Sequence, residues 1–301
     1  MSQRKFTLSV SIVLFQSDRD LLRQTVDTLA HAIRHATEAD LLGNVSVTLV
    51  DNDGRKGDAI TTEYDPGVAT HAVTTEYDPG VAIEAVTTAT TWRRIAGQGN
   101  VGFGRGHNLV LLDNPILGDF HLVLNPDALL AVDALTRALE WMRDTPDCAL
   151  VAPNARDTDD APLFLAKRYP DALTLFLRAA APQRLRTAFA QRLARYQLQD
   201  VVGPSGERQA RDVTLASGCC MLLRREPLAA TGGFDPAFFV YFEDYDLSLR
   251  IVDGGRWHID YLPNVKLVHF GGHAARKSVA HIRMFAAGAI RFFNKHGWKL
   301  A

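Results

Sequence analysis

One stretch decides the fold: LSVSIVLF at residues 8–15. Its largely apolar character, interrupted only by Ser9 and Ser11, predicts a buried strand. Ser17 followed by Asp20 resembles a capping box, and apolar residues then recur at helical spacing between Leu21 and Ile33. A second strand pattern, NVSVTLV at residues 44–50, ends in DND at 51–53. Strand, helix and strand in this order predict a right-handed βαβ unit in an α/β fold.

The same alternation continues along the chain. We expect a short helix at 109–112, a strand at 120–124, a helix at 131–143 and a strand at 149–152. A strand region at 214–224, a late strand at 265–269 and a helix from about 279 to 295 follow. In open α/β sheets the ligand lies beyond the carboxyl ends of the strands. Phe15 and Asp51 both fall at that predicted edge.

Composition narrows the class of protein. The chain has 301 residues, and 47% of them are hydrophobic, which suffices for a core. Its formal net charge of −1 argues against a nucleic-acid partner. Cys148, Cys219 and Cys220 show no metal-ligand spacing and predict buried thiols in a reducing compartment, hence a cytoplasmic protein. The first apolar run ends by Phe15 and predicts a strand rather than a signal peptide. No stretch is long enough to span a membrane.

Residues 163–198 differ from the rest of the chain, because they carry seven basic side chains against one acid. Apolar residues interleave with the basic ones. A basic amphipathic helix pair of this kind can lie on an anionic membrane surface. An ordinary solvated helix pair packed on the core explains the pattern equally well. The first interpretation predicts peripheral contact with a membrane through 163–198.

A short tandem duplication separates the second strand from the next motif. TTEYDPGVA at 61–69 recurs at 74–82, an offset of 13 residues, and each copy contains the turn signal Asp-Pro-Gly. Two copies are too few for a solenoid. The segment is interpreted as a surface loop without a role in chemistry.

We expect deletion of residues 70–82, one repeat unit, to leave activity largely intact. The deletion removes turn-forming loop sequence and no part of a predicted strand or helix. Activity and thermal unfolding of the shortened chain provide the check, and failure of the shortened chain to fold would contradict the interpretation.

The run YFEDYDLSLR at 241–250 places Glu243, Asp244 and Asp246 within four positions, beside aromatic residues. Like charges and desolvation both raise the pKa of a carboxylate, which suits proton abstraction near neutral pH. The pattern therefore indicates a catalytic base. Acidic residues also favour a helix N-terminus, so Glu243 and Asp244 also fit as the first turn of a helix. The two interpretations are compatible.

Asn125-Pro126-Asp127 directly follows an apolar strand. A carboxylate there can hold a divalent cation against a phosphate, and His269, at the end of the late strand, can be a second ligand. A turn or helix cap is the alternative for Asp127, and a satisfied core histidine is the alternative for His269. The glycines at 102, 104 and 106 fit a dinucleotide fingerprint badly and suit a loop that bends close to a sugar or phosphate.

Taken together, these motifs resemble those of the family 2 glycosyltransferases, particularly their bacterial rhamnosyltransferase-like branch. The resemblance covers about residues 8–275, and the motifs keep their order. They are VDN at 50–52, NVGFGRGHN at 100–108, LNPD at 124–127, SG at 217–218 with Met221 and Arg224, GGFD at 232–235 through EDYDLSLR at 243–250, and HFGG at 269–272.

The resemblance implies a GT-A fold: a mixed, mainly parallel sheet flanked by helices. Residues 1–275 would form one catalytic domain, with a nucleotide-sugar-binding half at 1–152, a basic helical insertion at 163–198 and an acceptor half at 213–275. A C-terminal helix would occupy 276–301. It also implies an inverting transfer from a nucleotide-sugar donor, by branch resemblance dTDP-rhamnose, to a glycan or lipid-linked acceptor in surface polysaccharide synthesis. Such an enzyme would lie in the cytoplasm or at the inner membrane face. A homodimer through the C-terminal helix is a further option.

The resemblance also implies roles for individual residues. Asp244, with Glu243 beside it, would be the catalytic base. Asp127 and His269 would hold Mg²⁺ or Mn²⁺. The donor would be bound by Phe15, Asp51, Asn100, Gly106, Asn108, Asn125, Ser217 and Gly218. The departure from the family pattern is Asn125, which stands where the first aspartate of the metal motif is usual and would lower metal affinity.

Two other functions remain open at this point. A non-catalytic nucleotide-sugar-binding relative would fit Asn125, although the intact acidic cluster argues against it. A nicotinamide oxidoreductase would rest on the glycines alone.

Overall fold

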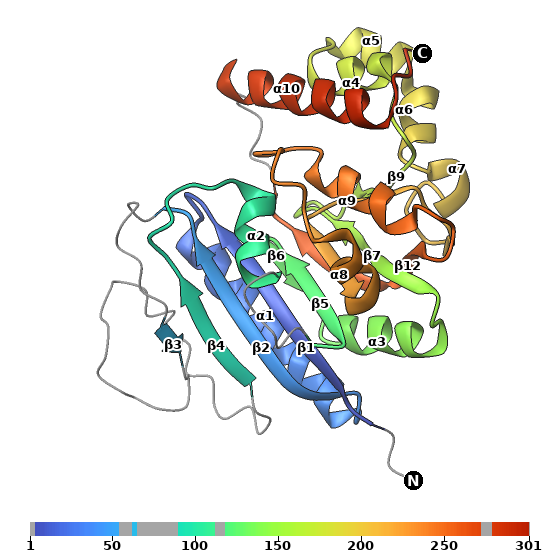
Figure 1. The fold of residues 1–301 in the computed structure, drawn as a ribbon. Helices are drawn as coiled ribbons and strands as arrows, with labels where there is room; N and C mark the ends of the chain where they lie inside the picture. Colours follow the sequence, from blue (N-terminus) through green and yellow to red (C-terminus); the bar gives the residue numbers. More distant parts are fainter. Residues whose placement is uncertain (1–3, 54–61, 65–89, 112–117, 272–278, 301) are drawn as a thin grey trace.

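The structure is a computed structural model that describes residues 4–53, 62–64, 90–111, 118–271 and 279–300 (Figure 1). The strands are β1 (Phe6–Leu14), β2 (Leu42–Asp51), β3 (Thr62–Tyr64), β4 (Thr90–Ile95), β5 (Phe120–Leu124), β6 (Ala128–Leu130), β7 (Cys148–Arg156), β8 (Pro162–Leu163), β9 (Ala166–Lys167), β10 (Leu215–Ala216), β11 (Cys220–Arg224) and β12 (His258–His269). The helices are α1 (Arg19–Glu38), α2 (Phe103–Leu111), α3 (Ala134–Asp144), α4 (Ala172–Ala179), α5 (Gln183–Ala188), α6 (Ala190–Tyr196), α7 (Gln199–Val202), α8 (Arg225–Thr231), α9 (Glu243–Val252) and α10 (Val279–His296).

A large mixed sheet forms the centre of the molecule, with strand order β3-β4-β2-β1-β5-β11-β7-β12-β6 and β8 beside β7. The neighbours β4, β2, β1 and β5 are parallel, whereas β11 runs antiparallel to both β5 and β7. β12 is parallel to β7, and β6 pairs antiparallel with β12. The predicted βαβ unit is confirmed, because β1 and β2 pair in parallel from Leu8 and Val45 to Leu14 and Asp51.

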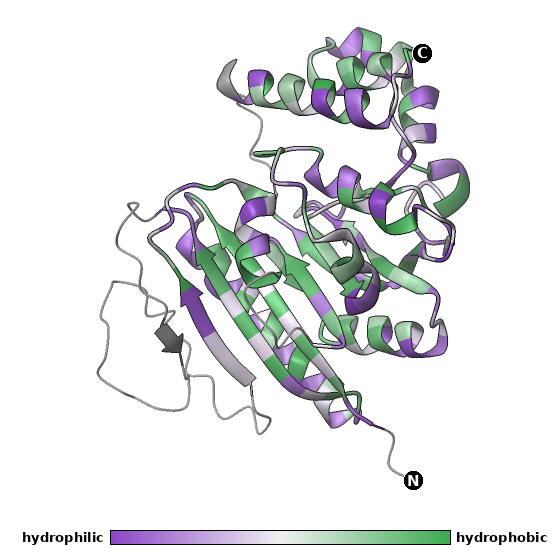
Figure 2. Ribbon diagram, viewed as in Figure 1, coloured by the Kyte–Doolittle hydropathy of each residue, from purple (hydrophilic) through white to green (hydrophobic). Residues whose placement is uncertain are grey.

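Helices cover both faces of the sheet. The apolar residues of α1, such as Leu22 and Leu29, pack with those of α3 in one core layer. Helices α2, α8 and α9 contribute to the core on the other face, where Phe234 and Leu247 are fully buried. In Figure 2 the central strands are mostly hydrophobic in colour, as expected of a sheet that is covered on both sides.

Helix α1 begins one residue later than the capping-box pattern suggests. Its N-cap is Asp18, whose carboxylate accepts hydrogen bonds from the backbone N–H groups of Asp20 and Leu21. Aspartate at this position satisfies two of the donors that every helix start leaves open. Ser17 instead accepts a hydrogen bond from the N–H of Phe15.

The glycine-rich motif is helix rather than loop, which corrects the sequence interpretation. Helix α2 already begins at Phe103, so two of the three glycines lie within it. A Cβ atom on Gly104 would come within 2.8 Å of Phe234, so the glycine lets the helix approach its neighbour closely. Sequence periodicity placed the helix too late, because glycine carries no hydrophobic signal.

The duplicated segment lies mostly outside the described residues. Thr62–Tyr64 of its first copy forms β3, which pairs antiparallel with β4 at the edge of the sheet. The prediction about its dispensability therefore stays a prediction.

A group of helices sits beyond one end of the sheet, at the top of Figure 1; we call α4, α5, α6 and α10 the cap. Backbone hydrogen bonds join its two distant segments, from the N–H of Ala172 to the oxygen of Lys299 and from Leu173 to Leu300. Leu175, Phe242 and Phe292 share a hydrophobic cluster that fastens the cap to α9. The predicted C-terminal helix is confirmed as α10, and residues 163–198 contain three short helices rather than two.

Candidate active site

The sheet topology brings polar residues to one edge. Asp51 ends β2, where Arg94 of β4 forms an ion pair with its carboxylate. The other Asp51 oxygen accepts a hydrogen bond of 2.8 Å from the N–H of Asp53. Phe15 follows β1 and is 48% exposed, so its ring is available for contact with a ligand. Asp51 and Phe15 thus lie at the predicted edge of the sheet, and their role in donor binding stays a prediction.

A cavity of about 380 Å³ opens beside this edge, between the sheet and the cap. The sheet side of its wall includes Asn125, Gly218 and His269. Helix α9 contributes Glu243 and Asp244, and the cap contributes residues of three helices. The structure thus brings the predicted base and part of the predicted metal motif into one cavity. The lining residues are Phe103, Asn125, Leu165, Lys167, Leu175, Arg178, Tyr196, Ser217, Gly218, Cys219, Val240, Tyr241, Phe242, Glu243, Asp244, Tyr245, His269 and Phe285.

Glu243 is the first residue of α9 and is only 4% exposed. Its Oε2 atom is buried and has no hydrogen-bond partner among the described residues. Burial, and next the charge of Asp244, raise the pKa of Glu243 to about 8. Ionising a buried carboxyl group that has one oxygen without a partner is costly, and Glu243 is therefore protonated at neutral pH.

Asp244 is held in a different way. One carboxylate oxygen accepts a 2.9 Å hydrogen bond from the N–H of Gly218, and the other accepts one of 2.9 Å from the N–H of Tyr245. Burial raises the pKa of Asp244, while these N–H groups and the cation of Lys167 act in the opposite direction. Asp244 therefore takes the negative charge of the pair first, and Glu243 keeps its proton.

The third acid of the run, Asp246, faces away from the cavity. It is fully buried and accepts hydrogen bonds from Arg250 at 2.7 Å and from His296 at 2.8 Å. Lys295 lies 2.6 Å from the same carboxylate. Asp246 thus holds the end of α10 against α9, which is a structural task.

Asn125 and Asp127 of the predicted metal motif both lie close to the imidazole of His269. His269 is opposite Ala128 in the pairing of β12 with β6, which places it beside the turn after β5. Its Nε2 atom lies 3.1 Å from Asp127 Oδ1 and 3.4 Å from Asn125 Nδ2. A side chain at position 271 would collide with the imidazole of His269, which explains the glycine there. Oxygen and nitrogen donors of this kind suit Mn²⁺ or Mg²⁺, so the residues fit such an ion.

The predicted donor-loop residues lie outside the cavity. Asn100 accepts a hydrogen bond of 3.0 Å from the N–H of Gly102 and so shapes the turn before α2. Gly106 is buried against Val13. Asn108 is 8% exposed and joins α2 to Phe234 through two hydrogen bonds. Its side chain donates to the carbonyl of Phe234 at 2.7 Å and accepts from the N–H of Phe234 at 2.9 Å. Their role in donor binding stays a prediction.

Sequence reasoning missed the basic residues of the cavity. Lys167 was counted within the basic surface segment, yet it is only 7% exposed and donates to the carbonyl of Phe164. Burial lowers the pKa of Lys167 well below its ordinary value, Arg178 lowers it further, and Asp244 opposes them. Arg178 donates a 3.1 Å hydrogen bond to the hydroxyl of Tyr196, which is 2.7 Å from the hydroxyl of Tyr245. The one available signal was a lone lysine after the apolar run LFLA at 163–166.

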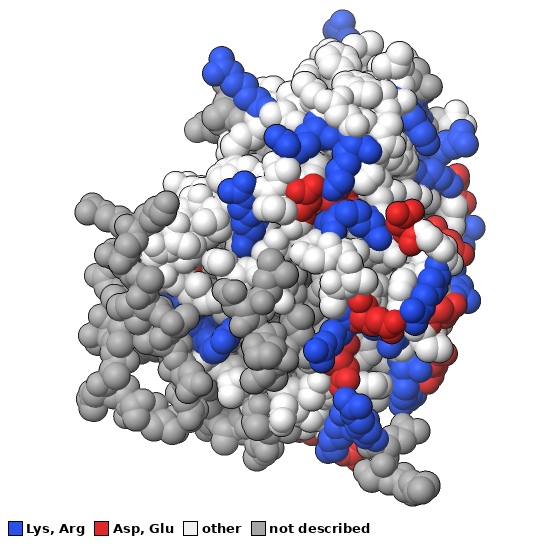
Figure 3. Space-filling view, viewed as in Figure 1, with Lys and Arg blue, Asp and Glu red and all other residues white. Residues whose placement is uncertain are grey.

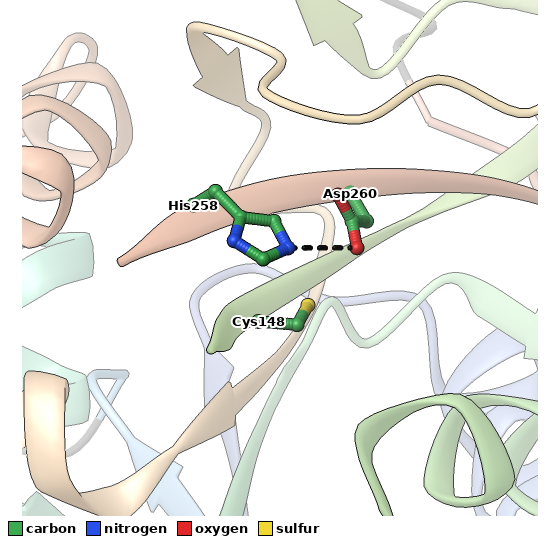
Figure 4. A group of neighbouring side chains, drawn as sticks. All are labelled: Cys148, His258 and Asp260. Atoms are coloured by element: carbon green, nitrogen blue, oxygen red, sulfur yellow. Dashed lines mark hydrogen bonds and ion pairs between the residues drawn. The ribbon is translucent and has the colours of Figure 1, made fainter. Parts of the chain in front are cut away.

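A second group with metal-ligand chemistry lies at the opposite end of these strands. Cys148 begins β7, and His258 and Asp260 lie at the start of β12, with ligand atoms within 4.8 Å of one another (Figure 4). Trp141 donates to Asp260 at 2.7 Å, and the guanidinium of Arg211 lies 2.8 Å from His258 Nε2. Because His269 is the last residue of β12 and His258 the first, this group is separate from the predicted catalytic metal site. All three cysteines are buried and free, as expected.

Comparison with known proteins identifies the family. The sequence profile described as "Glycosyltransferase like family 2" matches residues 8–287. The chain belongs to glycosyltransferase family 2. N-acetylglucosaminyl-diphospho-decaprenol L-rhamnosyltransferases from two strains of Mycobacterium tuberculosis (CDC 1551 / Oshkosh and ATCC 25618 / H37Rv) are each 26% identical over 212 residues. The match spans 66% of this chain and 66% of theirs, so it leaves about a third of the relatives' length unmatched.

Solved structures confirm the predicted GT-A fold of this family 2 chain. The mannosyltransferase PcManGT from Pyrobaculum calidifontis, in complex with GDP-Man and Mn²⁺, aligns with a TM-score of 0.53 at 18% identity over 96% of this chain and 66% of its own. GalNAc-T7 with UDP, GalNAc and Mn²⁺ aligns with a TM-score of 0.58 at 14% identity over 96% of this chain and 48% of its own. Within the described part of the chain, no helix is long and apolar enough to cross a membrane.

We expect Glu243→Gln to stabilise the fold above neutral pH. The folded chain keeps a proton on Glu243 up to about pH 8, whereas the unfolded chain releases it near pH 4.5. The stabilisation that Glu243 gives the wild-type fold is therefore fully present below about pH 4.5 and is lost as the pH rises through about 8. Glutamine does not ionise and carries no such loss.

Thermal unfolding from pH 5 to pH 9 measures the effect. The Tm advantage of E243Q should grow with pH, by about 2–4 °C for each kcal/mol. Glu38→Gln, at an exposed position at the end of α1, is the matched control and should show no such trend. A pH-independent difference for E243Q would show that Glu243 is ionised in the folded chain.

Proposed function

We propose that the chain is an inverting glycosyltransferase whose reaction takes place in the cavity between the sheet edge and the cap. One observation carries the proposal: Glu243 and Asp244 line the same cavity as Asn125 and His269, and His269 contacts Asp127. A base and a diphosphate-binding motif that face one space are what a single displacement at an anomeric carbon needs.

In the proposed reaction, Asp244 accepts the proton of the acceptor hydroxyl. The hydroxyl oxygen then forms a bond to the anomeric carbon of the donor while the bond from that carbon to the diphosphate breaks. The nucleoside diphosphate leaves on the opposite face. Gly218 and Tyr245 keep Asp244 oriented through their N–H groups, and the protonated Glu243 adds no second charge beside it.

His269 and Asp127 would bind a divalent cation, whereas the neutral Asn125 would contribute only a dipole. Such an ion, when bound, neutralises charge that develops on the departing diphosphate. Mn²⁺ accompanies the nucleotide in both solved structures named above. The basic residues Lys167 and Arg178 also line the cavity and would face the acceptor.

We further propose dTDP-rhamnose as donor and a lipid-linked glycan as acceptor, in surface polysaccharide synthesis. The names of the Mycobacterium tuberculosis relatives support the rhamnosyl group and the lipid-linked acceptor, whereas the dTDP carrier rests on the branch resemblance. A cytoplasmic protein at the inner membrane face, in contact with the membrane through 163–198, would meet such an acceptor. A homodimer through the C-terminal helix stays a prediction.

Asp244→Asn should lower the rate of sugar transfer by about 10²–10⁴-fold, because a general base of this kind contributes that much. Binding of the nucleoside diphosphate, measured by calorimetry, should survive. Asp253→Asn, an exposed position just after α9, is the control and should transfer normally. Near-normal turnover of D244N would eliminate the assignment.

Asp127→Ala should remove the dependence of donor binding on Mn²⁺. Calorimetric titration of the nucleoside diphosphate with and without Mn²⁺ measures it, and the affinity of the variant should be the same in both. Cys148→Ser serves as control, because Cys148 lies at the other end of the sheet, and it should keep the wild-type response. Equal Mn²⁺ stimulation of D127A and wild type would place the ion elsewhere.

A further inference from the structure

The cap concentrates positive charge in a chain that is nearly neutral. Residues 172–199 contain five arginines and no acid, and residues 279–300 contain four lysines and arginines and no acid. The fold places these two segments side by side, through hydrogen bonds of 2.8 Å and 3.3 Å between residues 172–173 and 299–300. Figure 3 shows blue and white side chains at the top of the molecule, where Figure 1 places α4, α5 and α10.

Four of these arginines point to solvent and have no counter-ion among the residues that the structure describes. Arg184 and Arg186 on α5 and Arg283 and Arg291 on α10 are exposed, and they form no ion pair within the described residues. Other basic residues of the cap are used internally: Arg192 pairs with Asp171 at 2.9 Å. The unpaired set is thus a distinct feature of the outer surface.

The same surface exposes large apolar side chains. Helix α5 has no buried residue at all, and its Leu185 is 42% exposed. Phe176 on α4 is 51% exposed and Phe189 is 39% exposed. A helix that buries nothing gains little from the tertiary packing that stabilises most short helices in proteins. It is therefore expected to pack against a partner.

Helix α10 is apolar on two sides. Its inner side, including Phe292, belongs to the cluster that fastens the cap to α9. Ile282 and Ile290 are 44% and 51% exposed and lie eight residues apart, which places them on one stripe along the helix. Arg283 and Arg291 follow them directly in sequence. Apolar residues flanked by unpaired cations are the composition of helices that lie in the interface of an anionic bilayer.

We infer that the outer surface of the cap, α5 together with the exposed stripe of α10, binds the surface of an anionic lipid bilayer. Charge complementarity selects this occupant, because lipid headgroups attract unpaired Arg side chains by about fivefold in affinity for each charge. The apolar residues enter the headgroup region between them. The prediction from sequence covered 163–198 alone, and the fold adds the C-terminal helix.

The cap forms part of the cavity wall, so contact between the cap and a bilayer would place the cavity at the membrane. This consequence rests on the proposed function. Leu175, Tyr196 and Phe285, from three cap helices, wall the cavity that holds Asp244. A cap bound to the bilayer would thus hold the mouth of the cavity at the membrane. An acceptor carried on a lipid would then reach the base without leaving the bilayer.

Co-sedimentation with phosphatidylcholine vesicles, with and without phosphatidylglycerol, tests the inference on the full chain. Wild type should bind the anionic vesicles, more weakly at high salt, and not the neutral ones. R184E/R186E and R283E/R291E should each weaken binding by at least about tenfold. R137E/R225E, on α3 and α8 outside the cap, makes the same change in net charge and should bind normally.

Several outcomes would overturn the inference. They are absence of binding to anionic vesicles, equal loss in the R137E/R225E control, or retention of binding in both cap variants. A second copy of the chain is the competing occupant, so light scattering accompanies the assay. A dimer that the cap variants dissociate, without vesicle binding by wild type, would assign the surface to self-association. D244N should bind vesicles as wild type does, so failure of the proposed reaction is distinguishable from failure of membrane binding.

Discussion

The backbone just before α9 is the constraint on which the site depends. Tyr241 and Phe242 both have left-handed conformations, with φ of 70° and 71°, although neither is glycine. Each such residue costs on the order of 1–3 kcal/mol and persists only where its surroundings fix it. Here α10 does so: Phe242 packs against Phe285 and Phe292, and a Cβ atom on Gly288 would lie 2.9 Å from the Tyr241 carbonyl. The turn lets the chain enter α9 with Glu243 and Asp244 already inside the cavity.

The three acids of that first turn are therefore distinguished by their partners rather than by their sequence. Asp246 meets Arg250, His296 and Lys295 and carries its charge as a structural anion. Asp244 meets backbone N–H groups, which stabilise a carboxylate but leave it lone pairs for a proton. Glu243 meets no donor through Oε2 and stays protonated. One short run thus contains an anchor, the proposed base and a neutral neighbour.

Much of the fold and part of the site could be predicted from the sequence. Long apolar runs fix β1, β2 and β5, and parallel pairing of these strands brings Asp51 and Asn125 to one edge. Lys167 and Arg178 could not be predicted as cavity residues, because their burial depends on how the cap docks. The 163–198 pattern was ambiguous for a related reason: its apolar residues divide between the inside of the cap, such as Leu175, and its exposed surface, such as Phe189.

The same docking explains why overall composition misleads for this chain. The formal net charge of −1 is an average over an uneven distribution of charge. Two segments without a single acid lie together at one end of the molecule. Asp246 joins that end to α9 through Lys295 and His296, so the charged surface and Asp244 belong to one packed unit. Any force that orients the cap must therefore orient the cavity as well. The charged surface and the proposed base are thus coupled by a buried carboxylate together with the aromatic cluster around Phe242 and Phe292.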